Sequence, residues 1–195
     1  MRVPIVSLCT FVAWLLAHAA AAAQAPEPLG PTVAAALERC DELTIFDYVT
    51  ARVEDATVLL SGKVTTPAKK ADLERRMATL AGVREVRSEI AVLPGGAADD
   101  ELRYQVSRAI YGHPAFWSYA AMRKPPIHIV VEDGSVRLEG TVRNQVERAM
   151  AASLASGRGG RIVVNALEAR PGSLHPGDPA ASPTRSRLPA SGSRP

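Results

Sequence analysis

The amino-acid sequence predicts an α+β protein made of two tandem modules, each with the order helix, strand, strand, helix, strand. The first observation is an internal repeat: VEDATVLLSGKV at 53–64 recurs as VEDGSVRLEGTV at 131–142, with seven of twelve residues identical and no gap. The second is the hydrophobic periodicity, which alternates as in a half-buried strand and then changes to a helical spacing. Duplication of one module explains both observations.

Each copy is predicted to begin its sheet with a β-hairpin. Asp55-Ala56 and Asp133-Gly134 mark the turns, since Asp-Gly is a strong signal for a two-residue hairpin loop. Apolar residues alternate on both sides of each turn, which places one face of the hairpin against a core. On the incoming strands these residues are Val49, Ala51 and Val53 in the first copy and Ile127, Ile129 and Val131 in the second.

A helix is expected after each hairpin. The first opens at a proline and carries Leu73, Met77 and Leu80 at helical spacing. Residues 86–92 and 163–169 alternate as third strands. Because a helix precedes each third strand, we expect that strand to join the same sheet. In the second copy the predicted buried stripe of the helix comprises Val146, Ala149, Met150, Ser153 and Leu154.

Each module also has a predicted leading helix. Residues 99–111 place Leu102, Val106 and Ile110 on one face, and residues 32–43 supply the counterpart in the first copy. The complete unit is therefore a small three-stranded mixed sheet covered by helices on one face. Such a unit buries only a thin core, so the two copies are expected to dock against each other.

The two ends of the chain differ from the rest. Residues 1–23 join Arg2 to a long apolar run that closes on small residues, which is typical of a secretory signal peptide cleaved near Ala23. A transmembrane anchor is the alternative. Residues 24–31 form a linker, and residues 171–195, rich in Pro, Ser, Gly, Ala and Arg, are predicted to be a disordered tail. We therefore expect a periplasmic protein.

The net charge of +3 does not indicate nucleic-acid binding. Arg2 and the arginines from Arg170 onward carry the surplus. Residues 24–169 hold 18 basic and 19 acidic residues, so the folded part is close to neutral. A nucleic-acid partner is not predicted, because such a protein concentrates basic residues on one face of its folded part.

The order of these elements resembles the BON domain, a family named after osmotically inducible and nodulation proteins of bacteria; the chain is similar to a dual-BON periplasmic protein. The resemblance rests on V-x-L-x-G-x-V ahead of a helix and on Val-x-Asn-x-Leu in the strand after it. It sets the first domain at residues 32–94, a linker at 95–98 and the second domain at 99–170. The structural residues of the repeat motif are Gly62, Asp133, Gly134, Gly140 and Asn165.

The resemblance implies a non-enzymatic, exported protein that binds phospholipid or the envelope surface and supports envelope integrity or osmotic stress tolerance. It implies no cofactor. The alternative is an interaction module that docks to another envelope protein. Three features depart from the family pattern: Ala56 replaces the turn glycine, Ser88 stands where the second copy has Asn165, and the second copy carries an insertion at 111–126.

This insertion, YGHPAFWSYAAMRKPP, is the strongest candidate for a binding surface. Aromatic side chains beside cations suit an interface with anionic lipid. The other interpretation is that Phe116 and Trp117 cap the core of the second module while the two cations face water. The candidate residues for a lipid or partner contact are Phe116, Trp117, Tyr119, Arg123 and Lys124.

Arg158 and Arg161, in the glycine-rich segment after the last helix, are weaker candidates for a phosphate contact, because this segment is foremost a helix stop. Cys40 lies at helical spacing from Val33 and is expected to be a buried free thiol. No histidine or cysteine spacing suits a metal, and no nucleophile stands in a recognisable motif. Neither a catalytic residue nor a metal ligand is predicted.

Overall fold

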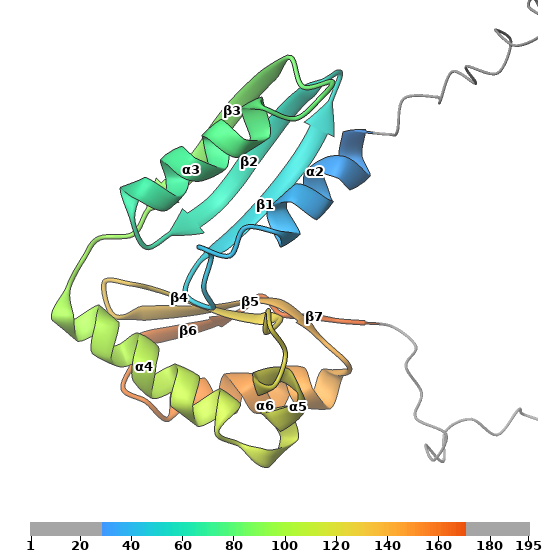
Figure 1. Cartoon of the computed structure of the whole chain (residues 1–195). Helices are drawn as coiled ribbons and strands as arrows, with labels where there is room; N and C mark the ends of the chain where they lie inside the picture. The colour runs from blue at the N-terminus through green and yellow to red at the C-terminus, as the bar shows by residue number, and fades with distance from the viewer. Residues whose placement is uncertain (1–28, 171–195) are drawn as a thin grey trace, which may run out of the picture.

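The computed structural model describes residues 29–170, and the predicted signal peptide and the predicted tail, residues 171–195, lie outside them. The described chain forms two modules, one above the other in Figure 1. The first contains α2 (Leu29–Glu38), β1 (Tyr48–Glu54), β2 (Thr57–Val64), α3 (Pro67–Ala78) and β3 (Glu85–Val92). The second contains α4 (Ala97–Tyr111), the 3-10 helix η2 (Pro114–Phe116), α5 (Trp117–Ala120), β4 (Ile127–Glu132), β5 (Ser135–Val142), α6 (Gln145–Ser156), β6 (Ile162–Asn165) and β7 (Glu168–Ala169).

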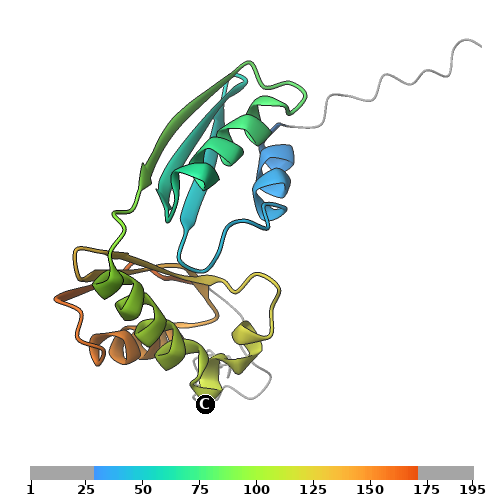
Figure 2. The same ribbon diagram turned by 60° about the vertical axis from the view of Figure 1, so that its left-hand side comes forward.

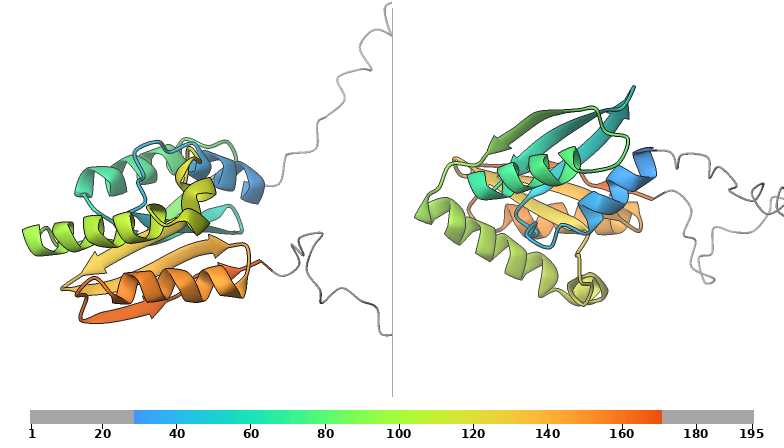
Figure 3. Two further views of the ribbon diagram at one scale, coloured as in Figure 1. Left: turned by 90° about the horizontal axis from the view of Figure 1, so that it is seen from below. Right: turned by 45° about the horizontal axis from the view of Figure 1, so that its top comes forward.

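The two sheets have the same topology. β1 pairs antiparallel with β2, and β3 joins β2 in parallel after the α3 crossover. In the second module β4 pairs antiparallel with β5, and β6 joins β5 in parallel after α6. In both modules the long helices lie on one face of the sheet (Figures 1 and 3). The predicted α+β modules with mixed sheets are therefore confirmed, and the short β7 adds a fourth strand to the second sheet.

The hairpin turns explain the acidic residue of the repeat motif. Asp55 and Ala56 have φ of 46° and 67°, and Asp133 and Gly134 have φ of 49° and 72°. Two successive positive φ values define the primed turn that matches the twist of a hairpin, and Asp tolerates this conformation. Ala56 adopts it as well, at a cost of about 1 kcal/mol relative to glycine.

The glycine of V-x-L-x-G-x-V is required by a close approach of the backbone. Gly62 and Gly140 have φ of 137° and 104°. A Cβ atom on Gly62 would lie 2.1 Å from the carbonyl oxygen of Tyr48, and one on Gly140 would lie 1.9 Å from that of Pro126. Any side chain would therefore force the first and second strands of the module apart.

Each module has a core between its sheet and its helices. In the first, Leu60 and Met77 are fully buried, and Cys40 is buried as predicted. The largest fully buried side chains of the second core are Phe116, Ile110, Ile127, Ile129 and Leu138. Within residues 29–170, every helix is too short or too polar to cross a bilayer.

Two helix predictions need correction. The first helix was expected at 32–43, but α2 ends at Glu38, and Cys40 reaches the core from the turn that follows, where its thiol donates to the carbonyl of Ala36 at 3.3 Å. A non-helical turn after the helix can bring Cys40 to the core at the same spacing from Val33 that a further helical turn would give. The predicted stripe of α6 is only partly correct: Met150 and Leu154 are half-buried against the core, whereas Val146 is 68% exposed. The buried residues of α6 are Glu147, Ala151 and Ala155.

The third strand of the second module is broken, and Asn165 holds the break. Its side chain donates to the carbonyl of Arg148 at 2.9 Å and accepts from the backbone of Leu167 at 3.3 Å. β6 therefore ends at Asn165 and the pairing resumes at β7. In the first module the equivalent Ser88 is too short for these bonds, and β3 continues without a break. The Ser88 hydroxyl is buried without a hydrogen-bond partner among the described residues.

Candidate functional site

The two modules meet along the loop between α2 and β1, residues 39–47 (Figure 2). The backbone N–H of Ile129 in β4 donates to the carbonyl of Ile45 at 2.7 Å, so the loop caps the edge of the second sheet. The side chains of Ile45 and Phe46 pack against the core of the second module. The ring of Phe46 meets that of Tyr104 edge to face, with centroids 5.6 Å apart. The expected docking of the two copies is thus present.

The insertion of the second module grips the same loop. The ammonium group of Lys124 donates to the carbonyl of Cys40 at 2.9 Å, and the guanidinium of Arg123 binds the carboxylate of Asp41 at 2.7 Å. The Arg123 side chain remains 81% exposed, so this ion pair is worth about 1 kcal/mol or less. Arg123 faces water as one interpretation expected, whereas Lys124 is half-buried at the junction.

A buried carboxylate fixes the end of the loop. Asp47 accepts hydrogen bonds from the backbone N–H and hydroxyl of Thr44 and of Thr65, at 2.7–2.8 Å. Lys69 of α3 adds an ion pair at 2.5 Å. Burial alone would raise the pKa of Asp47, but the bonds from Lys69, Thr44 and Thr65 outweigh it and hold the pKa below its ordinary value. Asp47 therefore joins the loop to β2 and α3 as an anion.

The aromatic residues of the insertion divide between core and surface. Phe116 is fully buried and stacks on the ring of Tyr119 at 6.0 Å between centroids. Trp117 is 62% exposed, and its indole N–H donates to the carbonyl of Gly112 at 3.3 Å. The core-capping interpretation therefore holds for Phe116 and not for Trp117.

Tyr119 belongs to a polar network at the inner side of the insertion. Its hydroxyl donates to Glu147 at 2.7 Å and accepts from the backbone N–H of Arg143 at 2.9 Å. The guanidinium of Arg143 binds Glu147 and lies over the ring of Tyr119, 5.2 Å from its centroid. Burial alone raises the pKa of Glu147, but the bonds from Tyr119 and Arg143 lower it further than burial raises it. These bonds explain why a glutamate occupies the buried face of α6.

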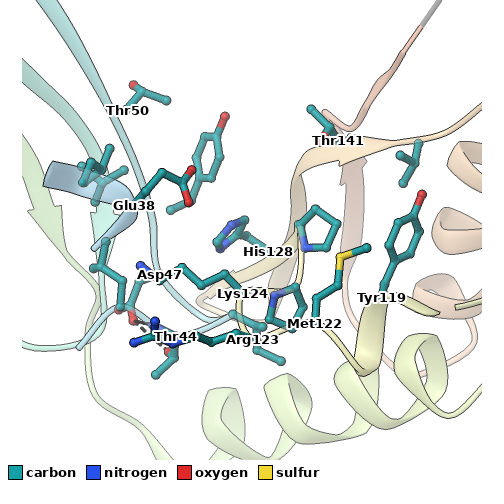
Figure 4. A pocket seen from close by; sticks show the side chains of 18 of the residues that line it. Glu38, Thr44, Asp47, Thr50, Tyr119, Met122, Arg123, Lys124, His128 and Thr141 are labelled. Carbon is teal, nitrogen blue, oxygen red and sulfur yellow. Dashed lines mark hydrogen bonds between the residues drawn. The ribbon is translucent and has the colours of Figure 1, made fainter. Parts of the chain in front are cut away.

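A cleft of about 1120 Å³ separates the two modules above this junction. Figure 4 shows it open between Thr50 of β1 and Thr141 of β5, with His128 at its floor. Burial lowers the pKa of His128, so the imidazole is neutral at pH 7. Its ring lies 5.4 Å from that of Tyr48. The other residues that line the cleft include Leu37, Glu38, Val49, Ala51, Met122, Arg123, Lys124, Pro125, Arg143 and Arg170.

The structure does not bring all predicted binding residues together. Arg161 lies at the opposite end of α4 from the insertion, where it packs on Gly134 and reaches the carbonyl of Asp133 at 3.5 Å. Asp99, at the start of α4, accepts from the backbone N–H groups of both turn residues. Because α4 is 15 residues long, its two ends lie about 22 Å apart, with Arg161 near the first end and the insertion at the other. Arg158 lines a shallow pocket on α4 with Tyr104 and Arg108.

Sequence reasoning missed several residues of the junction. Ile45, Asp47, Arg143 and Glu147 were assigned no role. The only feature of the sequence that could have indicated a structural role for Asp47 is its position directly before a predicted strand. That pattern is too common to interpret alone. Within residues 29–170, no group of three or more His, Cys, Asp or Glu side chains is placed to hold a metal ion.

Comparisons with known proteins bear on the repeat. The family model described as the BON domain matches twice, at residues 33–94 and 99–171. A comparison with curated proteins finds no significant match. Among solved structures, CdsD, a structural protein of the type III secretion system of Chlamydia trachomatis, is 15% identical with a TM-score of 0.26, over 73% of this chain and 93% of that one. The C-terminal domain of CdsD is 19% identical with a TM-score of 0.25, over 63% and 57%.

Proposed function

The chain belongs to the BON-domain family, and from this premise we propose that it is a binding protein of the periplasm, not an enzyme, that attaches to anionic phospholipid through the insertion of its second module. BON domains are found in periplasmic proteins and are generally non-enzymatic. Removal of the signal peptide near Ala23 would place the mature chain in this compartment. Support of envelope integrity or osmotic tolerance is the physiological role that we propose with it.

The exposed apolar residues of the insertion carry the proposal. Trp117 and Met122 are 62% and 47% exposed, although both are large apolar side chains within one six-residue segment. Arg123 follows directly and is also exposed. An aromatic side chain beside a cation suits the boundary between head groups and acyl chains, where the ring leaves water and the cation meets phosphate. Phe116, buried below, anchors the segment to the core.

Fluorescence of Trp117 tests this proposal directly. Of the two tryptophans of the sequence, only Trp117 lies in the proposed mature chain, residues 24–195, so it is the sole reporter there. Vesicles that contain phosphatidylglycerol are expected to shift its emission to shorter wavelength, and vesicles of phosphatidylcholine alone are not. Flotation of Trp117→Ala with the same anionic vesicles should fall at least about threefold.

The matched control is Val146→Ala, since Val146 is an equally exposed apolar residue on α6 outside the insertion. It should float as the unchanged protein does. An unshifted Trp117 emission with anionic vesicles, or equal flotation of Trp117→Ala, contradicts the proposal. Docking to another envelope protein is the second candidate function. It is favoured by the edge of β1 in the cleft, whose hydrogen-bonding groups are unpaired within residues 29–170, as described below.

A further inference from the structure

The outer edge of β4 has its hydrogen-bonding groups occupied. In an antiparallel hairpin alternate residues point their N–H and C=O groups away from the partner strand, and in β4 these are residues 127, 129 and 131. The hydroxyl of Tyr111 donates to the carbonyl of Ile127, and the guanidinium of Arg103 donates to that of Val131 at 2.7 Å. The N–H of Ile129 is bound by the loop, as described above.

The equivalent edge of β1 lacks these partners. Its outward residues are Val49, Ala51 and Val53, and within residues 29–170 their outward groups have no hydrogen bond. The reason lies in the leading helices. The core-facing residues of the two helices align, Leu29 with Leu102 and Val33 with Val106. This alignment places Gly30 at the position of Arg103 and Glu38 at that of Tyr111.

Neither replacement can cap the strand. Gly30 has no side chain, and the carboxylate of Glu38 has no proton to donate to a carbonyl. The side chains of these residues differ accordingly in burial. Those of Ile127, Ile129 and Val131 in β4 are fully buried, whereas those of Val49, Ala51 and Val53 in β1 are half-buried. Natural proteins usually cover or charge such an edge, because it is a template for another strand.

Space for another strand lies beside this edge. Val49 and Ala51 line the cleft of about 1120 Å³, which is bounded on its far side by residues of the second module. One extended chain needs about 4.8 Å of width beside the edge. A second copy of this protein would have to bring a whole sheet into the same space, past the wall that Met122 and Pro125 form.

The basic residues that line the cleft favour an extended chain that carries acidic side chains. The lining contains Arg123, Lys124, Arg143 and Arg170. Lys124 and Arg170 have no carboxylate partner within residues 29–170, whereas the lining carboxylate of Asp47 is saturated by its own module. Glu38 opposes this excess without cancelling it. The apolar lining by Leu37 and Val49 suits apolar side chains on the helix side of an added strand.

We propose that β1 receives an extended segment of a partner protein as an additional strand, and that this segment alternates apolar with acidic residues. Backbone hydrogen bonds to Val49 and Ala51 hold the segment, while Lys124 and Arg170 bind its carboxylates. This is the strand-addition mode of peptide recognition, in which pockets for alternate side chains supply specificity. The proposal goes beyond the lipid contact and does not depend on it. Met122 and Arg123 also line the cleft, but Trp117, the residue that reports the lipid contact, does not.

A seven-residue peptide that alternates glutamate and valine, labelled with fluorescein, is the probe. We expect saturable binding to the full chain, and slower hydrogen exchange at the amides of Val49 and Ala51 when the peptide is bound. The same sequence with alternate backbone nitrogens methylated should bind at least about tenfold more weakly, since it has lost donors of the added ladder. A peptide with lysine in place of glutamate should also bind more weakly.

Two variants locate the site. Ala51→Pro removes the outward N–H without removing a β1–β2 hydrogen bond and should weaken binding about tenfold, whereas the control Ala51→Gly keeps the N–H and should bind nearly as before. Arg170→Glu should weaken the acidic peptide and strengthen the lysine peptide. If Ala51→Pro does not fold, the methylated peptide still decides with the unchanged protein.

Equal affinity for the methylated and unmethylated peptides overturns the proposal, and so does the absence of saturable binding at millimolar peptide. Protection of Val49 and Ala51 that increases with protein concentration in the absence of peptide, together with a dimeric mass, would assign the edge to a second copy instead. Vesicle binding through Trp117 remains measurable in each case, so failure of this proposal is distinguishable from failure of the proposed function.

Discussion

Replacement of Asp47 by asparagine tests how much the buried carboxylate contributes to the first module. Asn keeps the shape of the side chain, but it replaces one acceptor oxygen by an NH₂ group that faces the donors of Lys69, Thr44 or Thr65. The side chain of Asp47 is fully buried and that of Lys69 is 17% exposed, so the loss is that of a buried, hydrogen-bonded pair. We expect the free energy of unfolding to fall by about 3 kcal/mol.

Urea unfolding followed by far-UV circular dichroism measures this loss. The control is Asp72→Asn, which breaks the exposed pairs with Arg75 and Arg76 on α3 and should cost less than about 1 kcal/mol. A loss below about 1 kcal/mol for Asp47→Asn as well would refute the reasoning, because it would place Asp47 in the class of exposed ion pairs.

The pH dependence of stability tests whether Asp47 contributes as an anion. The pKa of Asp47 is lower in the folded than in the unfolded chain, so its contribution is complete above the unfolded pKa and is lost as pH falls through the folded pKa. The difference in unfolding free energy between the unchanged protein and Asp47→Asn should therefore be constant between pH 7 and 5. It should shrink below about pH 4. A difference that grows on acidification would contradict the assignment of an anionic Asp47.

Two further predictions concern the turn and the thiol. Ala56→Gly should raise the free energy of unfolding by about 0.5–1 kcal/mol, because φ of 67° strains alanine, and Gly134→Ala should lower it; urea unfolding decides, and a destabilised Ala56→Gly would contradict the turn assignment. Burial raises the pKa of Cys40, so in a Cys9→Ser background its reaction with an aromatic disulfide reagent at pH 8 should be at least about 100-fold slower in the native than in the urea-unfolded protein. Equal rates would show that Cys40 is accessible.

Local patterns were sufficient to predict the two sheets. The two-residue loops require positive φ, and Asp55 and Asp133 are residues that accept it, so the hairpins follow from the chain within ten residues of each turn. Gly62 and Gly140 are likewise determined locally, by the approach of the preceding strand. The parallel third strands follow from the helix that must cross between them.

Helix faces were less predictable, because α6 chooses its buried side by its partners. The apolar count favoured Val146, but small residues let α6 approach the sheet, so Ala151 and Ala155 are buried. Glu147 is buried with them because Tyr119, from an insertion 28 residues earlier, supplies its hydrogen bond. No periodicity in α6 itself contains this information.

By itself the sequence determined the duplication, the order of elements, the turns and the family resemblance, since each depends on residues close in the chain. The division of the insertion into a buried Phe116 and an exposed Trp117, and the contact of Ile45 with Ile129, required the tertiary structure. So did the difference between the two leading strands, which share a sequence motif. Their edges differ because Arg103 and Tyr111 reach β4 from α4, while Gly30 and Glu38 leave β1 open to the cleft.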